Sequence, residues 1–130
     1  DMTTAIEKTL KPHATAAQLA VRFNVAREKL ADQTAYSVLR IVRELVINAI
    51  RHGEATSVKI AGTIDGNRLL CSVTDDGTGF DPDSAPGVLQ GHFGLQGIRE
   101  RLDELGGEFV LESTPGSGTK ARISLTIPHS

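Results

Sequence analysis

The stretch Arg43-Glu44-Leu45-Val46-Ile47-Asn48-Ala49-Ile50-Arg51-His52 lies in the most strongly periodic part of the chain. Glu44 and Asn48 are four positions apart, so on a helix they share one face, which Arg51 and His52 extend by another turn. The pattern predicts a core helix over about residues 33–52 with one polar edge. The apolar side chains recur at the spacing of a helix that buries a single stripe: Val38, Leu39, Val42, Leu45, Val46, Ala49 and Ile50.

Two interpretations of this polar edge are open. Charged helix faces are most often simply solvated, with Glu44 paired to a neighbour and Asn48 facing water. Asn is nevertheless a poor helix former, because its side chain competes for backbone hydrogen bonds. An Asn in the middle of such a helix therefore raises the question of a specific role.

The composition limits the possible classes of function. With 130 residues, 39% hydrophobic and 23% charged, the chain suits a single soluble domain spanning residues 1–130. A net charge of −2 gives no electrostatic case for binding nucleic acid or an anionic membrane. The single cysteine, Cys71, excludes a disulfide framework and is expected in the core. Without a bilayer-length apolar run or a signal-peptide pattern, we expect a cytoplasmic domain. We also expect the isolated domain to be monomeric.

The segments before the central helix give a weaker pattern. Residues 1–15 predict a modest amphipathic helix that Pro12 should end or bend. Residues 19–25 alternate apolar and polar side chains, as in a half-buried strand. A connection follows, in which Asp32 or Thr34 is expected to cap the central helix.

The segments after it read as two hairpins separated by a loop and a helix. Asp65-Gly66-Asn67 joins two strand patterns, residues 57–64 and 68–74, and Asp-Gly is a strong hairpin signal. Residues 75–93 lack periodicity, and so long a loop is often an active-site lid. A helix should then bury Leu95, Ile98, Leu102 and Leu105 before strands at residues 108–113 and 119–127. This order predicts an α+β two-layer sandwich: a mixed, mostly antiparallel sheet of about five strands with three helices on one face.

Three further motifs are candidates for chemistry. Asp75-Asp76-Gly77-Thr78-Gly79-Phe80 sets a carboxylate beside glycines that let backbone approach a ligand, although Asp and Gly also make ordinary turns. Too few acidic residues are present for a calcium loop. Gly91-His92-Phe93-Gly94-Leu95-Gln96-Gly97 opens a helix, whose unpaired N–H groups suit phosphate. Gly116-Ser117-Gly118-Thr119 is a hairpin turn that would leave the Thr119 hydroxyl free for a ligand.

Taken in order, these segments resemble the GHKL (Bergerat-fold) ATP-binding family, which includes gyrase, Hsp90, histidine kinases and MutL. The resemblance extends from about Leu19 to Ile127. Two segments, residues 40–52 and 91–101, look most like the catalytic domain of NarL-type sensor histidine kinases.

The resemblance implies a role for each motif residue in binding MgATP. Asn48 would be the Mg²⁺ ligand, and Glu44 would orient or deprotonate the attacking group. Asp75 would read adenine, supported by the Thr119 hydroxyl, while Gly77 and Gly79 let the chain turn past the base. The positions that would approach or donate N–H groups to the phosphates are Arg51, His52, Gly94, Leu95 and Gly97.

The same resemblance implies transfer of the γ-phosphoryl group to a histidine on a dimerisation helical segment that this chain lacks. His13 and His129 have the wrong context and are taken as incidental. The chain is then expected to be an excised domain of a longer, often membrane-anchored kinase that signals indirectly to a response regulator. Two alternatives stay open: a nucleotide-binding regulatory module without transfer activity, and an anti-sigma-type serine kinase of the same fold.

Overall fold

Strands and helices of the computed structural model follow one another in the predicted order over the residues that it describes, 2–79 and 95–127. Short 3-10 turns lie between the first helix and the first strand, at Lys11–His13, and between that strand and the second helix, at Arg27–Lys29. The elements of this part of the chain are α1 (Met2–Leu10), β1 (Gln18–Asn24), α2 (Asp32–Arg51), β2 (Ser57–Asp65), β3 (Arg68–Asp75), α4 (Leu95–Glu104), β4 (Glu108–Ser113) and β5 (Thr119–Thr126).

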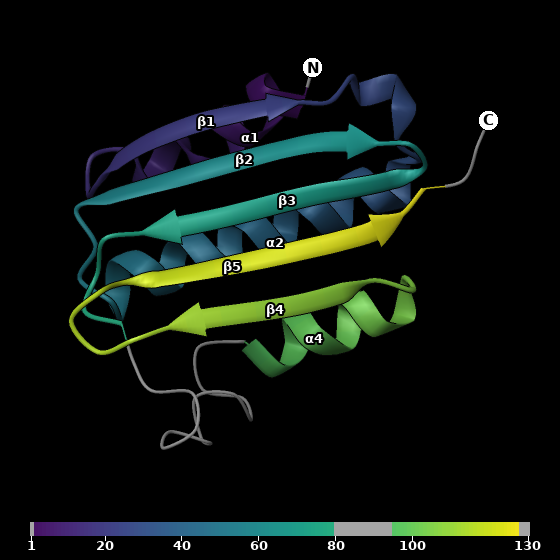
Figure 1. Cartoon of the computed structure of the whole chain (residues 1–130). Helices are drawn as coiled ribbons and strands as arrows, with labels where there is room; N and C mark the ends of the chain where they lie inside the picture. Colours follow the sequence, from purple (N-terminus) through teal and green to yellow (C-terminus); the bar gives the residue numbers. More distant parts are fainter. Residues whose placement is uncertain (1, 80–94, 128–130) are drawn as a thin grey trace.

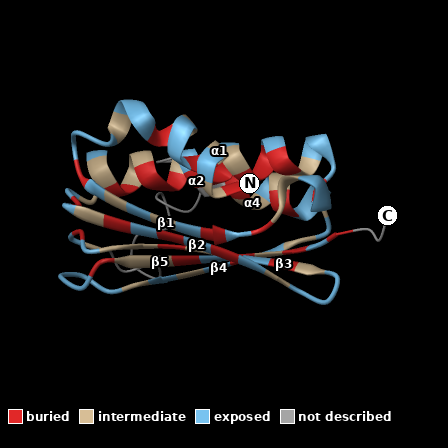
Figure 2. Ribbon diagram, turned by 90° about the horizontal axis from the view of Figure 1, so that it is seen from above, coloured by how far each residue is buried: buried red, intermediate tan, exposed pale blue. Residues whose placement is uncertain are grey.

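The five strands form one sheet in the order β1-β2-β3-β5-β4. β1 and β2 are parallel, and α2 makes the long crossover that a parallel pair requires. The remaining pairs are antiparallel. The helices lie on one face of the sheet and leave the other uncovered (Figures 1 and 2). The predicted two-layer α+β sandwich is confirmed.

Helix α2 lies across the middle of the sheet and provides much of the core. Its buried residues recur at helical spacing (red in Figure 2), and each large apolar side chain contributes about 1.5–3 kcal/mol when fully buried. Leu39 and Ile50, predicted in this stripe, are only partly buried at its edges. Glu44 and Asn48 lie off the stripe and are half-buried. The buried residues are Ala35, Ser37, Val38, Ile41, Val42, Leu45, Val46 and Ala49.

Two predictions about helix ends need comment. The first α-helix ends at Leu10 instead of Thr15, and Pro12 lies in the 3-10 turn that follows, as its missing N–H requires. The capping prediction was wrong, because Ala31 is the N-cap of α2 and no side chain caps it. Asp32 already belongs to the first turn, where its Oδ1 accepts a 2.6 Å hydrogen bond from Arg27.

The two hairpins are close to their predicted bounds. β2 and β3 are joined through Gly66, which takes φ +63°, a conformation that glycine adopts without steric cost. On the inner face a Cβ at Gly62 would fall 2.4 Å from the Phe23 ring, so this glycine makes room for the ring. Cys71 is buried as predicted, and burial raises the pKa of its thiol to about 12. None of the helices in the described parts is both long and apolar enough to cross a membrane.

Candidate functional site

The turn after β3 is held against both the end of α2 and the β4–β5 turn. The N–H of Thr78 donates to the Gly53 carbonyl at 2.7 Å, and the N–H of Gly116 donates to the Thr78 carbonyl at 2.6 Å. A Cβ at Gly77 would lie 2.4 Å from the Gly53 oxygen. Gly79 has φ +66°, and its Cβ would lie 2.2 Å from the Thr114 oxygen. Glycine is therefore required at both positions by close backbone approach.

Asp75 ends β3 with its carboxylate half-buried beside this turn. Its Oδ1 accepts a 2.8 Å hydrogen bond from the N–H of Gly77. Burial raises the pKa of the Asp75 carboxyl above its usual range, against the lowering effect of the backbone N–H groups of Gly77 and Thr119. A carboxylate fixed in this way and partly shielded from water is suited to accept a hydrogen bond from a ligand.

Asp76 has a different role, which the sequence did not reveal. Its exposed carboxylate accepts hydrogen bonds from the N–H and hydroxyl of Thr56 and from the N–H of Ser57, at 2.7–2.9 Å. These bonds lower the pKa of Asp76 and tie the turn to the start of β2. Strand alternation could have distinguished the two aspartates, because it places Asp75, and not Asp76, on the inner face with buried Val73.

Thr119 starts β5 directly opposite Asp75 in the β3–β5 register. Its hydroxyl was predicted to be free, and that prediction was wrong. Its Oγ1 lies 2.8 Å from the Ser113 Oγ, which also donates to the Gly118 carbonyl at 3.1 Å. Asp75, Ser113 and Thr119 line a hollow of about 170 Å³ at this end of the sheet.

A second hollow, of about 240 Å³, lies between α2 and α4 and brings Glu44 and Gly97 together. Arg40 and Arg101 line it as well, and the sequence analysis gave neither a role. Arg40 is four residues before Glu44 and so shares its helix face, which was a usable signal. Gly97 faces open space, since a Cβ there would meet no atom within 4 Å. The hollow therefore sets a carboxylate between two arginines beside the first turn of α4.

The other predicted residues are less closely grouped. Asn48 is half-buried one turn beyond Glu44. Its backbone carbonyl accepts hydrogen bonds from the N–H groups of His52 and Gly53, at 2.9 and 3.1 Å. Arg51 and His52 are exposed at the end of α2 and do not line the Glu44 hollow. Gly94 and most of the predicted lid fall outside the described residues. Leu95 begins α4, but its side chain is also outside what is described.

The two hollows are separate in the described residues but are linked along α2. Glu44 and Gly53 are nine positions apart, about 14 Å at 1.5 Å per helical residue. Asn48 lies between them, and Gly53 touches the turn that carries Asp75. The Glu44 hollow and the Asp75 hollow therefore lie at opposite ends of one helical segment, an arrangement that suits a ligand of extended shape.

Comparison with known families decides the identity of this arrangement. A family profile described as "Histidine kinase-, DNA gyrase B-, and HSP90-like ATPase" matches residues 34–129, most of the chain. The chain belongs to this ATPase family. Membership implies ATP binding, and the half-buried Asp75 carboxylate is able to accept a hydrogen bond from a ligand.

The relatives are sensor histidine kinases. The histidine-protein kinase/phosphatase UhpB of Salmonella typhimurium is 32% identical over 100 residues, covering 77% of this chain and 18% of UhpB. The nitrate/nitrite sensor protein NarQ of Escherichia coli is 30% identical over 128 residues, 95% of this chain and 22% of NarQ. The chain thus spans about a fifth of these relatives. The resemblance to the NarL-type subgroup is confirmed, and the chain is a catalytic ATPase domain of the sensor-kinase type.

Solved structures confirm the fold. The blue-light activated histidine kinase EL346 of Erythrobacter litoralis matches with a TM-score of 0.74 at 23% identity, covering 97% of this chain and 39% of that protein. The histidine kinase AdeS of Acinetobacter baumannii matches with a TM-score of 0.73 at 16% identity, over 98% of this chain and 64% of AdeS.

Proposed function

We propose that this domain binds MgATP along α2, with adenine at Asp75 and the phosphates toward Glu44 and Gly97. Within a longer kinase it would transfer the γ-phosphoryl group to a histidine on dimerisation helices outside this chain. The observation that carries the proposal is the placement of Glu44 with Gly97 in one hollow and Asp75 with Thr119 in another, joined past Asn48.

At the base end, Asp75 accepts a hydrogen bond from the exocyclic amine of adenine. Guanine presents a carbonyl oxygen at the equivalent position and would face the carboxylate with a second acceptor. The Thr119–Ser113 hydroxyl pair supports the base beside Asp75. Gly77 and Gly79 let the backbone pass close to it. Selectivity for ATP over GTP follows from this end of the site.

At the phosphate end, Asn48 offers an amide oxygen, a hard ligand that suits a Mg²⁺ ion retaining several waters. The ion would supply charge neutralisation. Backbone N–H groups of Gly94, Leu95 and Gly97 at the start of α4 would hold phosphate oxygens. Arg51 and His52 are exposed at the Asp75 end of the α2 segment, so they would approach the phosphates from the base side of the site. These residues hold the phosphates in one orientation.

Glu44 acts on the incoming histidine side chain. A neutral imidazole is already nucleophilic near pH 7, so Glu44 needs only to accept its N–H hydrogen bond and orient the other nitrogen. Positioning and charge stabilisation are the main contributions a protein makes to phosphoryl transfer. The dimerisation helices are the direct partner of this site, and a response regulator receives the phosphoryl group indirectly.

The experiment supplies the helical segment in trans or by fusion and measures acid-labile phosphate on it from γ-labelled ATP. Asn48→Ala should abolish the Mg²⁺-dependent part of ATP binding and the labelling while the domain stays folded. Asn67→Ala, in the exposed β2–β3 turn, is the matched control and should change neither. Unchanged MgATP affinity and labelling in Asn48→Ala would contradict the metal role. Nucleotide binding without any label in the unmutated protein would instead support a regulatory module.

A further inference from the structure

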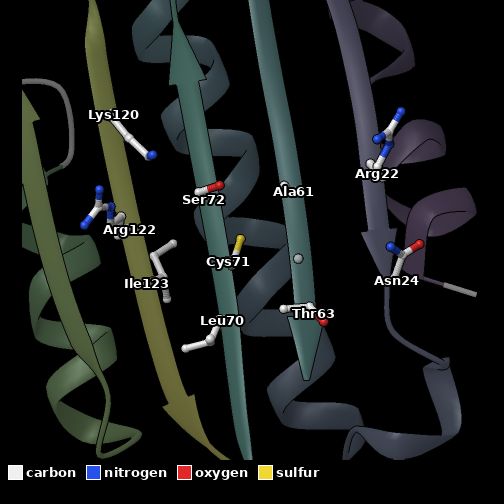
Figure 3. Close-up of a pocket in the computed structure, with 11 residues that line it drawn as sticks. Arg22, Asn24, Ala61, Thr63, Leu70, Cys71, Ser72, Lys120, Arg122 and Ile123 are labelled. Atoms are coloured by element: carbon white, nitrogen blue, oxygen red, sulfur yellow. The ribbon is translucent and has the colours of Figure 1, made fainter. Parts of the chain in front are cut away.

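The uncovered face of the sheet carries a trough whose lining shares Lys120 with the Asp75 hollow. It measures about 490 Å³, and residues of four strands line it (Figure 3). In this view Arg22 on β1 lies at one side, and Arg122 and Lys120 on β5 lie at the other. Ala61 and Ser72, between them, have short side chains.

Strand register explains why this face is hollowed. Arg22 pairs with Ala61, Ala61 with Ser72, and Ser72 with Arg122, so these four residues form one row across the strands. The two central strands contribute the smallest side chains, and the outer two contribute long cationic ones. Neighbouring strands are about 4.8 Å apart, so the Cα atoms of Arg22 and Arg122 are roughly 14 Å apart.

The cations of the trough are poorly neutralised. Within the described residues, Arg22 and Lys120 make no ion pair or side-chain hydrogen bond. Arg122 contacts only Glu112, at 3.3 Å, and both side chains of that pair are about half exposed. Of the residues that the structure describes, those lining the trough include no carboxylate. A concentration of positive charge that Glu112 only partly balances, in a chain of net charge −2, favours an anionic occupant.

We propose that the trough binds an extended acidic segment of a partner protein, lying across the strands. Four residues of extended chain span about 13 Å, so two carboxylates four positions apart reach Arg22 and Arg122 together. Ala61 and the exposed Leu70 give the residues between them an apolar floor. Three cations with Glu112 at the rim are too few for a nucleic-acid or membrane surface, which needs a broad basic patch.

Location gives this surface a separate role from nucleotide binding. The trough lies on the face away from the helices, whereas Glu44 and Asn48 lie on α2, on the opposite side of the sheet (Figure 2). A partner docked there would leave the phosphate end of the proposed nucleotide site open, whereas Lys120 lines both the trough and the Asp75 hollow.

The test measures binding of a fluorescent, extended peptide of Ser and Thr with two Asp residues four positions apart, by anisotropy at low salt. The double variant Arg22→Glu/Arg122→Glu should bind about tenfold more weakly or worse, because like charges then meet. Ala61→Leu, which fills the floor without changing charge, should also weaken binding. Lys59→Glu is the control: it reverses one charge, where the double variant reverses two, on the same exposed face but outside the trough, and should have little effect.

Charge reversal of the peptide gives the decisive comparison. A peptide with Lys in place of both Asp residues should bind the Arg22→Glu/Arg122→Glu protein better than the unmutated one. ATP affinity checks that each variant is folded. The proposal is overturned if Lys59→Glu weakens binding as much as the double variant. It is also overturned if a peptide with Asn in place of both Asp residues binds as tightly as the Asp peptide. Tighter binding of single-stranded DNA or phosphatidylserine vesicles than of the Asp peptide would overturn it as well.

Discussion

The two ends of the proposed nucleotide site are built in different ways. At the Asp75 end, backbone packs on backbone, with glycines where a Cβ would overlap a carbonyl oxygen and with hydrogen bonds that tie the turn to α2 and β5. At the Glu44 end, side chains from two helices surround an open hollow, and among the described residues no atom outside the helix backbone lies within 4 Å of a Cβ added at Gly97. The base end is thus part of the folded framework, whereas the phosphate end is an arrangement of side chains on rigid helices. Substitutions at the base end should lower the free energy of unfolding, whereas substitutions at the phosphate end should lower phosphoryl transfer or phosphate binding.

The largest effect is expected from Glu44→Gln. Losing the carboxylate that orients the acceptor imidazole should lower phosphoryl transfer by about 10²-fold or more, the scale of general acid–base and orienting groups. Since Glu44 is only half-buried and makes no ion pair in the described residues, the free energy of unfolding should change by less than about 0.5 kcal/mol. Single-turnover labelling and urea unfolding measure the two quantities. Glu104→Gln, on the exposed side of α4, is the control, and equal transfer rates in both variants would contradict the role of Glu44.

Gly79→Ala should reveal the opposite behaviour. Its φ of +66° strains any L-residue, and the added Cβ would meet the Thr114 carbonyl at 2.2 Å. We expect the free energy of unfolding to fall by about 2–4 kcal/mol, together with a loss of ATP affinity. Gly66→Ala isolates the strain, since φ is +63° there but no atom lies within 4 Å; its cost should be only about 1–2 kcal/mol. Equal destabilisation by both would show that backbone contact at Gly79 is unimportant.

Asp75→Asn should weaken ATP binding by about 1–3 kcal/mol, the range for disrupting a buried hydrogen bond, and should reduce discrimination against GTP. Competition calorimetry with the two nucleotides measures both effects. If the unmutated domain binds GTP as tightly as ATP, Asp75 does not read adenine.

The pH dependence follows from the raised pKa of Asp75. The carboxyl must be ionised to accept the adenine amine, so ATP affinity should fall on acidification with a midpoint above 3.8, the ordinary value. In the absence of nucleotide the folded state holds this proton more tightly than the unfolded chain does. Its contribution therefore favours folding below pH 3.8 and is lost as pH rises through the raised pKa. Asp75→Asn should remove this pH dependence both from ATP affinity and from stability. If the variant's ATP affinity changed with pH as in the unmutated domain, the titrating group would be another one.

The smallest effect is expected from Gly97→Ala. With no atom within 4 Å of the new Cβ and a helical position, the change should stabilise the domain by about 0.5–1 kcal/mol. MgATP affinity should nevertheless fall severalfold, while adenosine binding should not change, because only the phosphates approach this turn. Thermal unfolding and parallel titrations test this, and unchanged MgATP affinity would remove Gly97 from the site.

The sequence predicted most of what depends on local pattern. Helical spacing predicted the buried stripe of α2, and the Asp-Gly pair predicted the hairpin between β2 and β3. Features set by distant pairing were missed: the Ser113 hydroxyl reaches Thr119 only through the β4–β5 register, and Arg101 comes to line the same hollow as Glu44 only through α2–α4 packing. The absent side-chain cap at Ala31 was missed for a local reason, since Asp32 and Thr34 are both residue types that commonly cap helices.

The account rests on one nucleotide occupying both ends of this helical segment. The most direct measurement is a crystal structure of the domain with Mg²⁺ and a non-hydrolysable ATP analogue. The account predicts the adenine amine within hydrogen-bond distance of the Asp75 carboxylate and the metal on the Asn48 amide oxygen. A nucleotide held in the outer trough of the sheet, or one that leaves either Asp75 or Asn48 without contact, would contradict it.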